Sequence, residues 1–363
     1  MAQHTTDSKD PEQPLDIPFV APHVLAHMEE SHVRFKATPE HNPQFAYSLA
    51  LPKAWAYSRE FGPVSGDPFL PQGLGFFTGS VQPEAAVVAV TVTPMLFEIP
   101  IDSWIRTSFE VEGWQVRSAK WFPGALGLFF DIVGTRVLND VPEVRRTSVR
   151  VEGGNVFSVN CLCGRKNWEA AKEIFWTAHL TFKLEVGTGM TRMEPWVPAR
   201  SEHAPEFEMA HPTSWTAEPV ESPPEDVSAI DVRLLDVNGE VLLAYLQARA
   251  ERRSEGAPVA PVEARLADAM DRLKKAGLAV TSPPRRLTED EDPRAAAVEG
   301  WLGGFVGQGR IGTSDVVTRV GFIERDGVAV TFSSMSPIPT DDPLAALRAE
   351  RAFQIARSTF RFA

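Results

Sequence analysis

Two short stretches of this chain have residue types and spacing that could bind a metal ion. In the first, His23 and His27 lie four residues apart and Glu30 follows three residues later, so that a helix would place all three on one face. No third strong ligand is anchored in a recognisable motif, and Pro22 would set His23 at the entrance of that helix. We interpret this stretch as a solvated arm and predict neither a metal nor a cofactor.

The second stretch is Cys161-Leu-Cys163, since a pair of cysteines can bind soft metals. On a strand, residues i and i+2 point to the same face, and here they continue an apolar series that begins with Phe157 and Val159. Because a buried free cysteine behaves as a small hydrophobic residue, we predict that both cysteines belong to the core. Two cysteines this close cannot form a disulfide framework, which fits a reducing compartment.

Motifs for catalysis are missing from the sequence. There is no G-x-S-x-G or H-E-x-x-H, and the glycines between Gly303 and Gly309 lack the Lys-Ser/Thr end of a phosphate loop. Bends or bulges in a strand explain these glycines more simply. His179 falls on the polar side of its predicted helix, so we expect it at the surface. We predict a protein that is not an enzyme, although carboxylates that meet only in the fold remain an open alternative.

The charge balance is acidic, with 48 Asp and Glu against 36 Lys and Arg. Nucleic acids and anionic membranes are bound through clustered positive charge, so neither is an expected partner. The first residues contain no apolar signal region, and no run of residues approaches the length of a membrane span. We therefore expect a cytoplasmic protein.

An internal repeat organises the chain. The stretch Phe175-Trp-Thr-Ala-His-Leu-Thr-Phe182 recurs as Phe353-Gln-Ile-Ala-Arg-Ser-Thr-Phe360, and in a helix each copy would present the same apolar stripe. Three further pairs match in the same order: an alternating strand with Pro-x-x-Trp at 47–55 and 207–215, a helix-ending glycine at 113 and 277, and a glycine-containing hairpin at 152–154 and 326–327. The sequence thus predicts two copies of one domain.

We divide the chain into a disordered tail and N-terminal arm (1–42), a first domain (43–186), a linker (187–204) and a second domain (205–363). The tail and the linker are rich in Pro and polar residues, and we expect the linker to be extended and exposed.

Each domain is expected to contain strands, a helix, three consecutive strands and a closing helix. The features that support this order are a helix from Asp102 to Val111, a helix opened by Asn167, a hairpin at Asn238-Gly239, a helix from Val262 stopped at Gly277, a Pro-rich loop from Ser282 to Pro293, and a helix from Pro343 to Phe362. Runs of adjacent antiparallel strands with helices against one face give an α+β fold, here two similar α/β sandwich domains.

The repeated signature resembles the PsbP-like superfamily of small α/β sandwiches, whose bacterial members include DcrB-like proteins and the Eag chaperones of type VI secretion. The residues that carry the resemblance are Tyr47, Leu49, Leu51, Pro52 and Trp55, then Phe207, Met209, Pro212 and Trp215, together with the closing helices. The resemblance implies tandem domains that are mostly non-enzymatic binding modules. Eag chaperones hold apolar helices of their effectors on a concave sheet face.

Most of the large aromatic residues lie in the first domain, and a bulkier core is the simplest explanation. The functional alternative rests on 126–133, where both alternating faces are apolar apart from Asp131. Such a strand is covered on both sides or exposes one side to a partner. The candidate partner-binding residues are Trp104, Trp121, Phe122, Phe129 and Phe130.

These observations predict a non-enzymatic adaptor or chaperone that binds an apolar helix or extended peptide of a client protein on the aromatic face of the first domain. One alternative is a structural or assembly subunit of a secretion or biosynthetic complex, which would form a homodimer through the same surface. The other is an enzyme or metal protein that uses His23, His27 or the cysteine pair.

Overall fold

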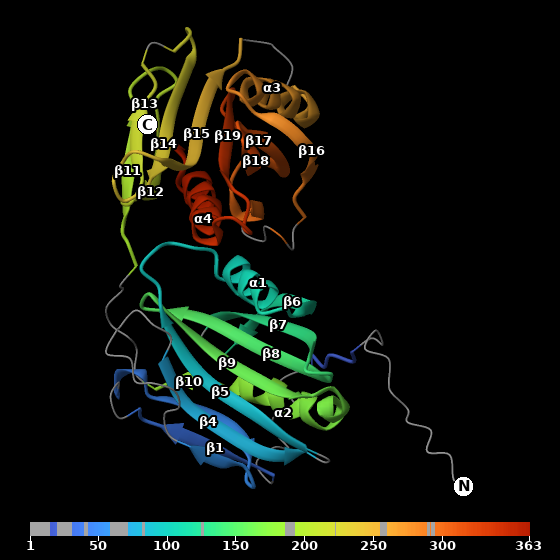
Figure 1. Ribbon diagram of the computed structural model, residues 1–363. Coiled ribbons are helices and arrows are strands. Elements are labelled where there is room, and N and C mark those ends of the chain that lie inside the picture. The colour runs from blue at the N-terminus through green and yellow to red at the C-terminus, as the bar shows by residue number, and fades with distance from the viewer. Residues whose placement is uncertain are drawn as a thin grey trace, which may run out of the picture. The chain divides into compact units, whose positions relative to one another are not determined.

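The computed structural model describes residues 15–19, 31–39, 43–58, 72–81, 84–124, 127–185, 193–221, 223–254, 260–288, 291 and 295–363. They fall into two units, domain 1 from residues 1–96 and 101–193 and domain 2 from residues 97–100 and 194–363 (Figure 1).

Domain 1 contains β1 (His32–Ala37), β2 (Tyr47–Pro52), β3 (Ala56–Ser58), β4 (Gln72–Val81), β5 (Glu84–Pro94), α1 (Ile101–Val111), β6 (Gln115–Gly124), β7 (Gly127–Leu138), β8 (Val141–Glu152), β9 (Asn155–Gly164), α2 (Trp168–Thr181) and β10 (Lys183–Leu184). Domain 2 repeats this order with β11 (Trp196–Ser201), β12 (Phe207–Pro212), β13 (Thr216–Pro219), β14 (Val227–Leu235), β15 (Leu242–Arg252), α3 (Val262–Lys275), β16 (Ala279–Arg286), β17 (Trp301–Ile311), β18 (Ser314–Arg325), β19 (Val328–Pro337), α4 (Pro343–Thr359) and β20 (Arg361–Phe362).

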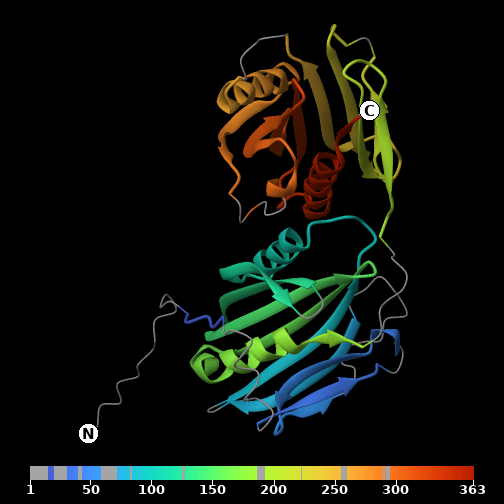
Figure 2. The same ribbon diagram turned by 180° about the vertical axis from the view of Figure 1, so that it is seen from behind.

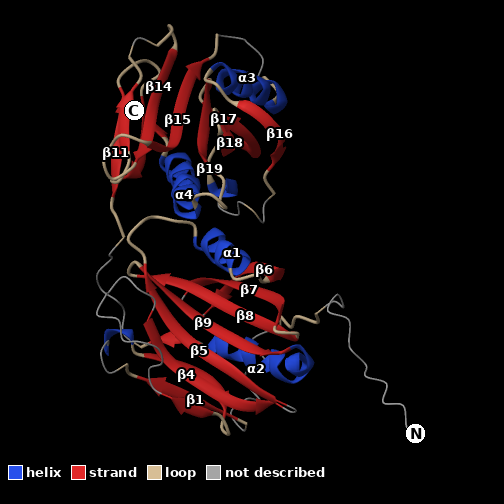
Figure 3. Ribbon diagram, in the orientation of Figure 1, coloured by secondary structure: helices blue, strands red, loops and turns tan. Residues whose placement is uncertain are grey.

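The two domains have the same sheet topology. Figure 3 shows the strands of each domain in red and the helices in blue. Domain 1 has a seven-stranded sheet of order β3-β4-β5-β9-β8-β7-β6, and domain 2 has one of order β13-β14-β15-β19-β18-β17-β16. Each also has a three-stranded sheet, β1-β2-β10 or β11-β12-β20. All strand pairs are antiparallel, as short hairpin connections allow. The predicted fold class, two similar α+β sandwich domains, is confirmed.

Helices cover both faces of the large sheet in domain 1. In the view from behind, α2 and the small sheet lie against one face (Figure 2), and their residues share one core cluster with β5 and β9. On the other face, α1 packs against β6, β7 and β8. The strand at 127–138 is therefore covered on both sides, which accounts for its two apolar faces.

The closing helices bury the predicted stripe. Phe175, Ala178 and Phe182 are all buried, and so are their counterparts in domain 2. Both helices end at a threonine, α4 before its predicted end at Phe362, and the residues that follow pair with the small sheet. The hydroxyl of Thr181 accepts the N–H of Ala50 at 2.9 Å, and that of Thr359 accepts the N–H of Ala210 at 2.8 Å. This hydrogen bond ties each helix end to the small sheet.

The Pro-x-x-Trp signature is a turn at the end of β2 and of β12. The N–H of Trp55 donates to the carbonyl of Pro52 at 3.0 Å, and Trp215 repeats the bond to Pro212 at the same distance. Both indole rings are buried. The turn therefore places a large aromatic side chain in the core of each domain.

Two strands lie in stretches for which the sequence predicted an arm and a linker. β1 pairs along its whole length with β2, and β11 pairs in the same way with β12. Each supplies an edge strand to a small sheet that would otherwise contain one long strand and a two-residue partner.

One local prediction in domain 2 is wrong and another is confirmed. The predicted loop from Ser282 includes the second half of β16, because an edge strand with register shifts tolerates Pro283 and Pro284. The hairpin at Asn238-Gly239 is confirmed, and its last strand pair is Leu235 with Leu242. The carboxylate of Asp236 closes this loop by accepting backbone N–H groups from Glu240 and Val241.

Candidate functional site

A segment of five residues near the N-terminus, Leu15–Phe19, lies along α2 in domain 1, and we call it the strap. Its side chains alternate. Leu15 and Ile17 pack against the core cluster, whereas the side chain of Asp16 points to solvent. Phe19 stacks on Phe122 of β6 with ring centroids 5.0 Å apart. The strap thus binds as an extended segment with every second side chain inward.

Two carbonyl groups of the strap accept hydrogen bonds from side chains of the domain. The indole N–H of Trp168 donates to the carbonyl of Asp16 at 2.9 Å, and the guanidinium of Arg146 donates to the carbonyl of Pro18 at 3.3 and 3.4 Å. Lys172 forms an ion pair with the carboxylate of Asp16. The domain therefore binds two alternate backbone carbonyls, which every peptide has, and one acidic side chain.

The end of the strap completes an aromatic cluster of Phe19, Phe122, Phe129 and Trp176. Trp176 lies edge-on to Phe19 at 6.0 Å and to Phe122 at 5.1 Å, and it lies 6.1 Å from Phe129. These distances fall within the range of favourable aromatic pairs. The ammonium of Lys120 lies 5.4 Å from the Phe19 ring, which remains 43 % exposed.

The structure divides the five predicted binding residues between two faces. Adjacent strand residues point to opposite sides, so the cross-strand pair Phe122 and Phe129 faces α2. The pair Trp121 and Phe130 lies on the other face, where Arg106 of α1 stacks on Phe130 at 5.2 Å. Trp104 is half-buried on α1. Phe129 and Phe130 are fully buried core residues, whereas Phe122 is one of the residues that contact the strap.

A buried polar network lies beneath the strap. Arg146 on β8 donates to both oxygens of Asp131 on β7, at 2.9 and 3.0 Å. Nδ1 of His179 on α2 lies 3.0 Å from Asp131, and Nε2 lies 3.2 Å from Sγ of Cys161 on β9. All four side chains are fully buried. The guanidinium of Arg146 also lies 4.3 Å from the ring of Trp176.

The charges in this network follow from burial and pairing. Burial alone would raise the pKa of Asp131, but Arg146 and His179 outweigh it and hold that pKa below its usual range. Burial lowers the pKa of His179 despite the neighbouring carboxylate, so the ring is neutral at pH 7. With its one proton on Nδ1 facing Asp131, the ring accepts a hydrogen bond from the Cys161 thiol at Nε2.

The order Cys161, His179, Asp131 has the connectivity of a nucleophile, a base and an orienting carboxylate. Burial, however, raises the pKa of Cys161 well above its usual range, so the sulfur is a thiol and not the reactive thiolate. Nor is any of the three side chains open to a substrate. The arrangement serves as an internal hydrogen-bonded support for Arg146, the residue that holds the strap.

The expected surface position of His179 is wrong, because Asp131, 48 residues earlier in the chain, covers the polar side of the helix. The predicted core position of Cys161 and Cys163 is confirmed, since both are buried free cysteines. His23 and His27 lie outside the described residues. In the part of the chain that the structure describes, no three His, Cys, Asp or Glu side chains gather as a metal site.

Sequence reasoning missed the strap and the network beneath it. A signal for each was present. Leu15, Ile17 and Phe19 alternate with polar residues or proline, and Asp131 is the one charged residue in an otherwise apolar strand segment. A charged residue at such a position needs a buried partner, and Arg146 on the next predicted strand was a candidate.

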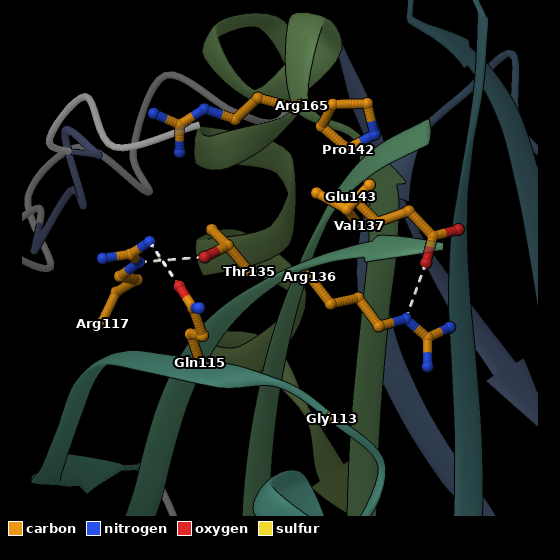
Figure 4. A pocket seen from close by; sticks show the side chains of 9 residues that line it. All are labelled: Gly113, Gln115, Arg117, Thr135, Arg136, Val137, Pro142, Glu143 and Arg165. Carbon is orange, nitrogen blue, oxygen red and sulfur yellow. Dashed lines mark hydrogen bonds and ion pairs between the residues drawn. The ribbon is translucent and has the colours of Figure 1, made fainter. Parts of the chain in front are cut away.

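A separate cavity of about 300 Å³ lies at the ends of β6, β7 and β8 (Figure 4). Its lining residues include Arg117, Arg136 and Arg165. Arg136 is paired with Glu143 at 2.9 Å, and Arg117 is held by the neutral side chains of Thr135 and Gln115, both at 2.9 Å. Guanidinium groups in such an arrangement suit the recognition of an anion rather than catalysis.

The fold and this site define a class: a two-domain α+β protein whose first domain holds an extended segment along its closing helix. No protein-family model matches the chain, and no curated protein matches it. Within the described ranges, no helix combines the length and apolarity needed to cross a bilayer.

Several solved structures are similar to this chain. Cyanobacterial PsbP (CyanoP) from Synechocystis sp. PCC 6803 is 14% identical, with 42% of this chain and 92% of that chain covered and a TM-score of 0.31. LpqN of Mycobacterium tuberculosis, involved in cell envelope biogenesis, is 12% identical, with 44% and 96% covered and a TM-score of 0.28. A Tle4-Tli4 complex structure is 9% identical, with 87% and 94% covered and a TM-score of 0.22. These likenesses carry no information about ligand or activity.

Proposed function

We propose that this protein is a non-enzymatic adaptor or chaperone that binds an extended apolar segment of a client protein in domain 1. The binding surface, which we call the groove, is the part of α2 and the end of β6 that contacts the strap in the structure. The observation that carries the proposal is the hydrogen bonding of two alternate strap carbonyls by Trp168 and Arg146. Side chains that bind backbone groups at this spacing suit a peptide in an extended conformation.

The residues of the groove support binding rather than catalysis. Its polar groups are donors that are already directed at a peptide backbone, and its apolar part is the cluster of Phe122, Phe129 and Trp176. Arg146 is held in place by Asp131, so little side-chain freedom is lost when a peptide binds. Aromatic anchors with a fixed cation beside them are typical of binding sites in which a few residues provide most of the affinity.

The experiment is site-specific photo-cross-linking in the native cell. A cross-linking residue at Lys120, which is exposed and lies beside the Phe19 ring, samples the open end of the groove. The same residue at Lys274 on α3 is the matched control in domain 2. We expect a protein partner captured from Lys120 and not from Lys274, and its capture should decrease when Phe122→Ala removes the aromatic contact.

Phe122→Ala is the appropriate probe because Phe122 is only half-buried, whereas truncating the fully buried Phe129 would damage the core. Capture of the same partner from both positions, or capture unaffected by Phe122→Ala, would argue against a client site in this groove.

A further inference from the structure

We infer that the client segment of this groove has the pattern apolar, acidic, apolar, proline, aromatic, and that the strap is a built-in copy of that ligand which competes with the client. This inference rests on the proposed function and names the chemistry of its ligand. The pattern is taken from the strap, Leu15-Asp-Ile-Pro-Phe19, because each of its five positions contacts a group of the domain.

The first and third positions are apolar because Leu15 and Ile17 pack against the core cluster. The second position is acidic because Lys172, whose side chain is mostly buried, pairs with Asp16. The fifth position is aromatic because Phe19 stacks on Phe122 at an interplanar angle of 21° and meets Trp176 edge-on at 90°.

Proline suits the fourth position for a backbone reason. Its fixed φ keeps the segment extended, and its missing N–H leaves no donor to be satisfied, while its carbonyl accepts from Arg146. A residue with a free N–H at this position would need a further acceptor. The strap thus supplies hydrogen-bond acceptors and apolar side chains. The domain supplies the matching hydrogen-bond donors and the aromatic cluster.

Competition follows from covalent attachment. The strap and domain 1 belong to one chain, and covalent attachment of a ligand to its receptor raises its effective concentration, typically to the order of millimolar. A client must displace the strap, so only a segment that matches the groove better, or one delivered at high local concentration, binds. Release of the strap should therefore raise the affinity for an added peptide.

The experiment measures the affinity of a fluorescein-labelled peptide that copies residues 14–20, Pro-Leu-Asp-Ile-Pro-Phe-Val, by fluorescence polarisation. It uses the full-length wild-type protein and a full-length strap-released variant, Ile17→Asp with Phe19→Asp. We expect the strap-released variant to bind about ten-fold more tightly than the wild type. Replacing the peptide's Phe by Ala should weaken binding about ten-fold. A scrambled peptide of equal composition should bind no more tightly than this Phe-to-Ala peptide.

A charge reversal separates recognition from misfolding. In the strap-released background, Lys172→Glu should weaken binding of the copy peptide by about three-fold, and a peptide with Lys in place of Asp should recover that loss. Recovery requires a folded groove. Equal binding of the scrambled and copy peptides would overturn the pattern but leave the proposed function standing. No binding of any peptide to the strap-released variant would overturn this inference, while the proposed function would still depend on the cross-linking result from Lys120.

Discussion

Domain 1 and domain 2 have the same strand order, yet different groups fill the space under the closing helix. In register, Asp131, Cys161 and His179 of domain 1 correspond to Gly304, Ser334 and Arg357 of domain 2. In domain 2 the ring of Trp301 lies against Arg357 at 4.6 Å. It also packs so closely on Gly304 and Gly321 that a Cβ at Gly321 would lie 2.4 Å from the ring.

The residues that hold the strap differ in the same way. Trp168 and Lys172 of α2 correspond to Ala346 and Glu350 of α4, so domain 2 has neither the indole donor nor the ammonium. Its Arg319, the counterpart of Arg146, pairs instead with Glu350 at 2.8 Å. The topology therefore comes from the shared pattern, and binding of a segment comes from residues that only domain 1 has.

The largest expected effect is the loss of Arg146. Arg146→Met leaves the carboxylate of Asp131 buried without its cation, which should destabilise domain 1 by about 3–5 kcal/mol. Arg319→Met is the matched change in domain 2. It should cost at most about 1 kcal/mol because both partners are partly exposed. Hydrogen exchange of each domain's central strands measures the two effects separately.

A double variant, Asp131→Leu with Arg146→Met, should recover most of the stability, because an apolar pair has no unpaired charge. Equal destabilisation by the two arginine changes would remove the distinction that we draw between the domains.

The second effect tests what the domains share. Thr181→Val and Thr359→Val each remove the hydroxyl that accepts a strand N–H, from Ala50 or Ala210. Each change should destabilise its own domain by about 1–2 kcal/mol, and by similar amounts, because the bond has the same geometry in both. Urea unfolding and hydrogen exchange measure this. Ser358→Ala is the control, since its hydroxyl bonds only within α4, and an effect as large as that of Thr359→Val would assign the loss to the helix itself.

The features that the sequence predicted correctly are those with a short-range pattern. The stripe of Phe175, Ala178 and Phe182 and the alternation that places Cys161 and Cys163 in the core both depend on neighbours along the chain. The candidate site depends on register between strands. That register alone decides that Phe122 faces α2 and that Trp121 faces away from it.

The burial of His179 could not be read from its helix, because the group that pairs with it comes from β7. The strap was missed for a related reason. Five alternating residues are a weak signal on their own, and their partners Trp168 and Arg146 are more than a hundred residues away in the chain.

The third effect concerns pH and is absent at neutral pH. The pKa of His179 in the folded protein is below its usual value of 6.5, so below that pH the unfolded chain binds a proton that the folded domain excludes. Stability should therefore fall as the pH decreases from about 7 to 5, by up to about 1.4 kcal/mol per unit.

The groups facing this ring are Asp131 on β7, Arg146 and Arg150 on β8, and Cys161 on β9. Urea unfolding at several pH values should show a flatter profile for His179→Gln than for the wild type. His211, whose pKa burial also lowers, contributes equally to both proteins. Superimposable profiles would mean that His179 titrates alike in the folded and unfolded states.

The smallest expected effect tests whether the strap also shields Cys161 from reagents in solution. Burial raises the pKa of Cys161 well above its usual range and that of Cys163 to about 12, so both thiols should react with iodoacetamide far more slowly in the native protein than in urea. The strap-released variant should react no faster, because α2 and the sheet enclose the sulfur atoms, while the strap contacts Arg146. Mass spectrometry of the alkylated protein measures each site. Selective labelling of Cys161 after strap release would show that the strap closes a path to the Cys161–His179–Asp131 arrangement. Domain 1 would then be better explained as a nucleophile site that the strap controls than as a binding groove.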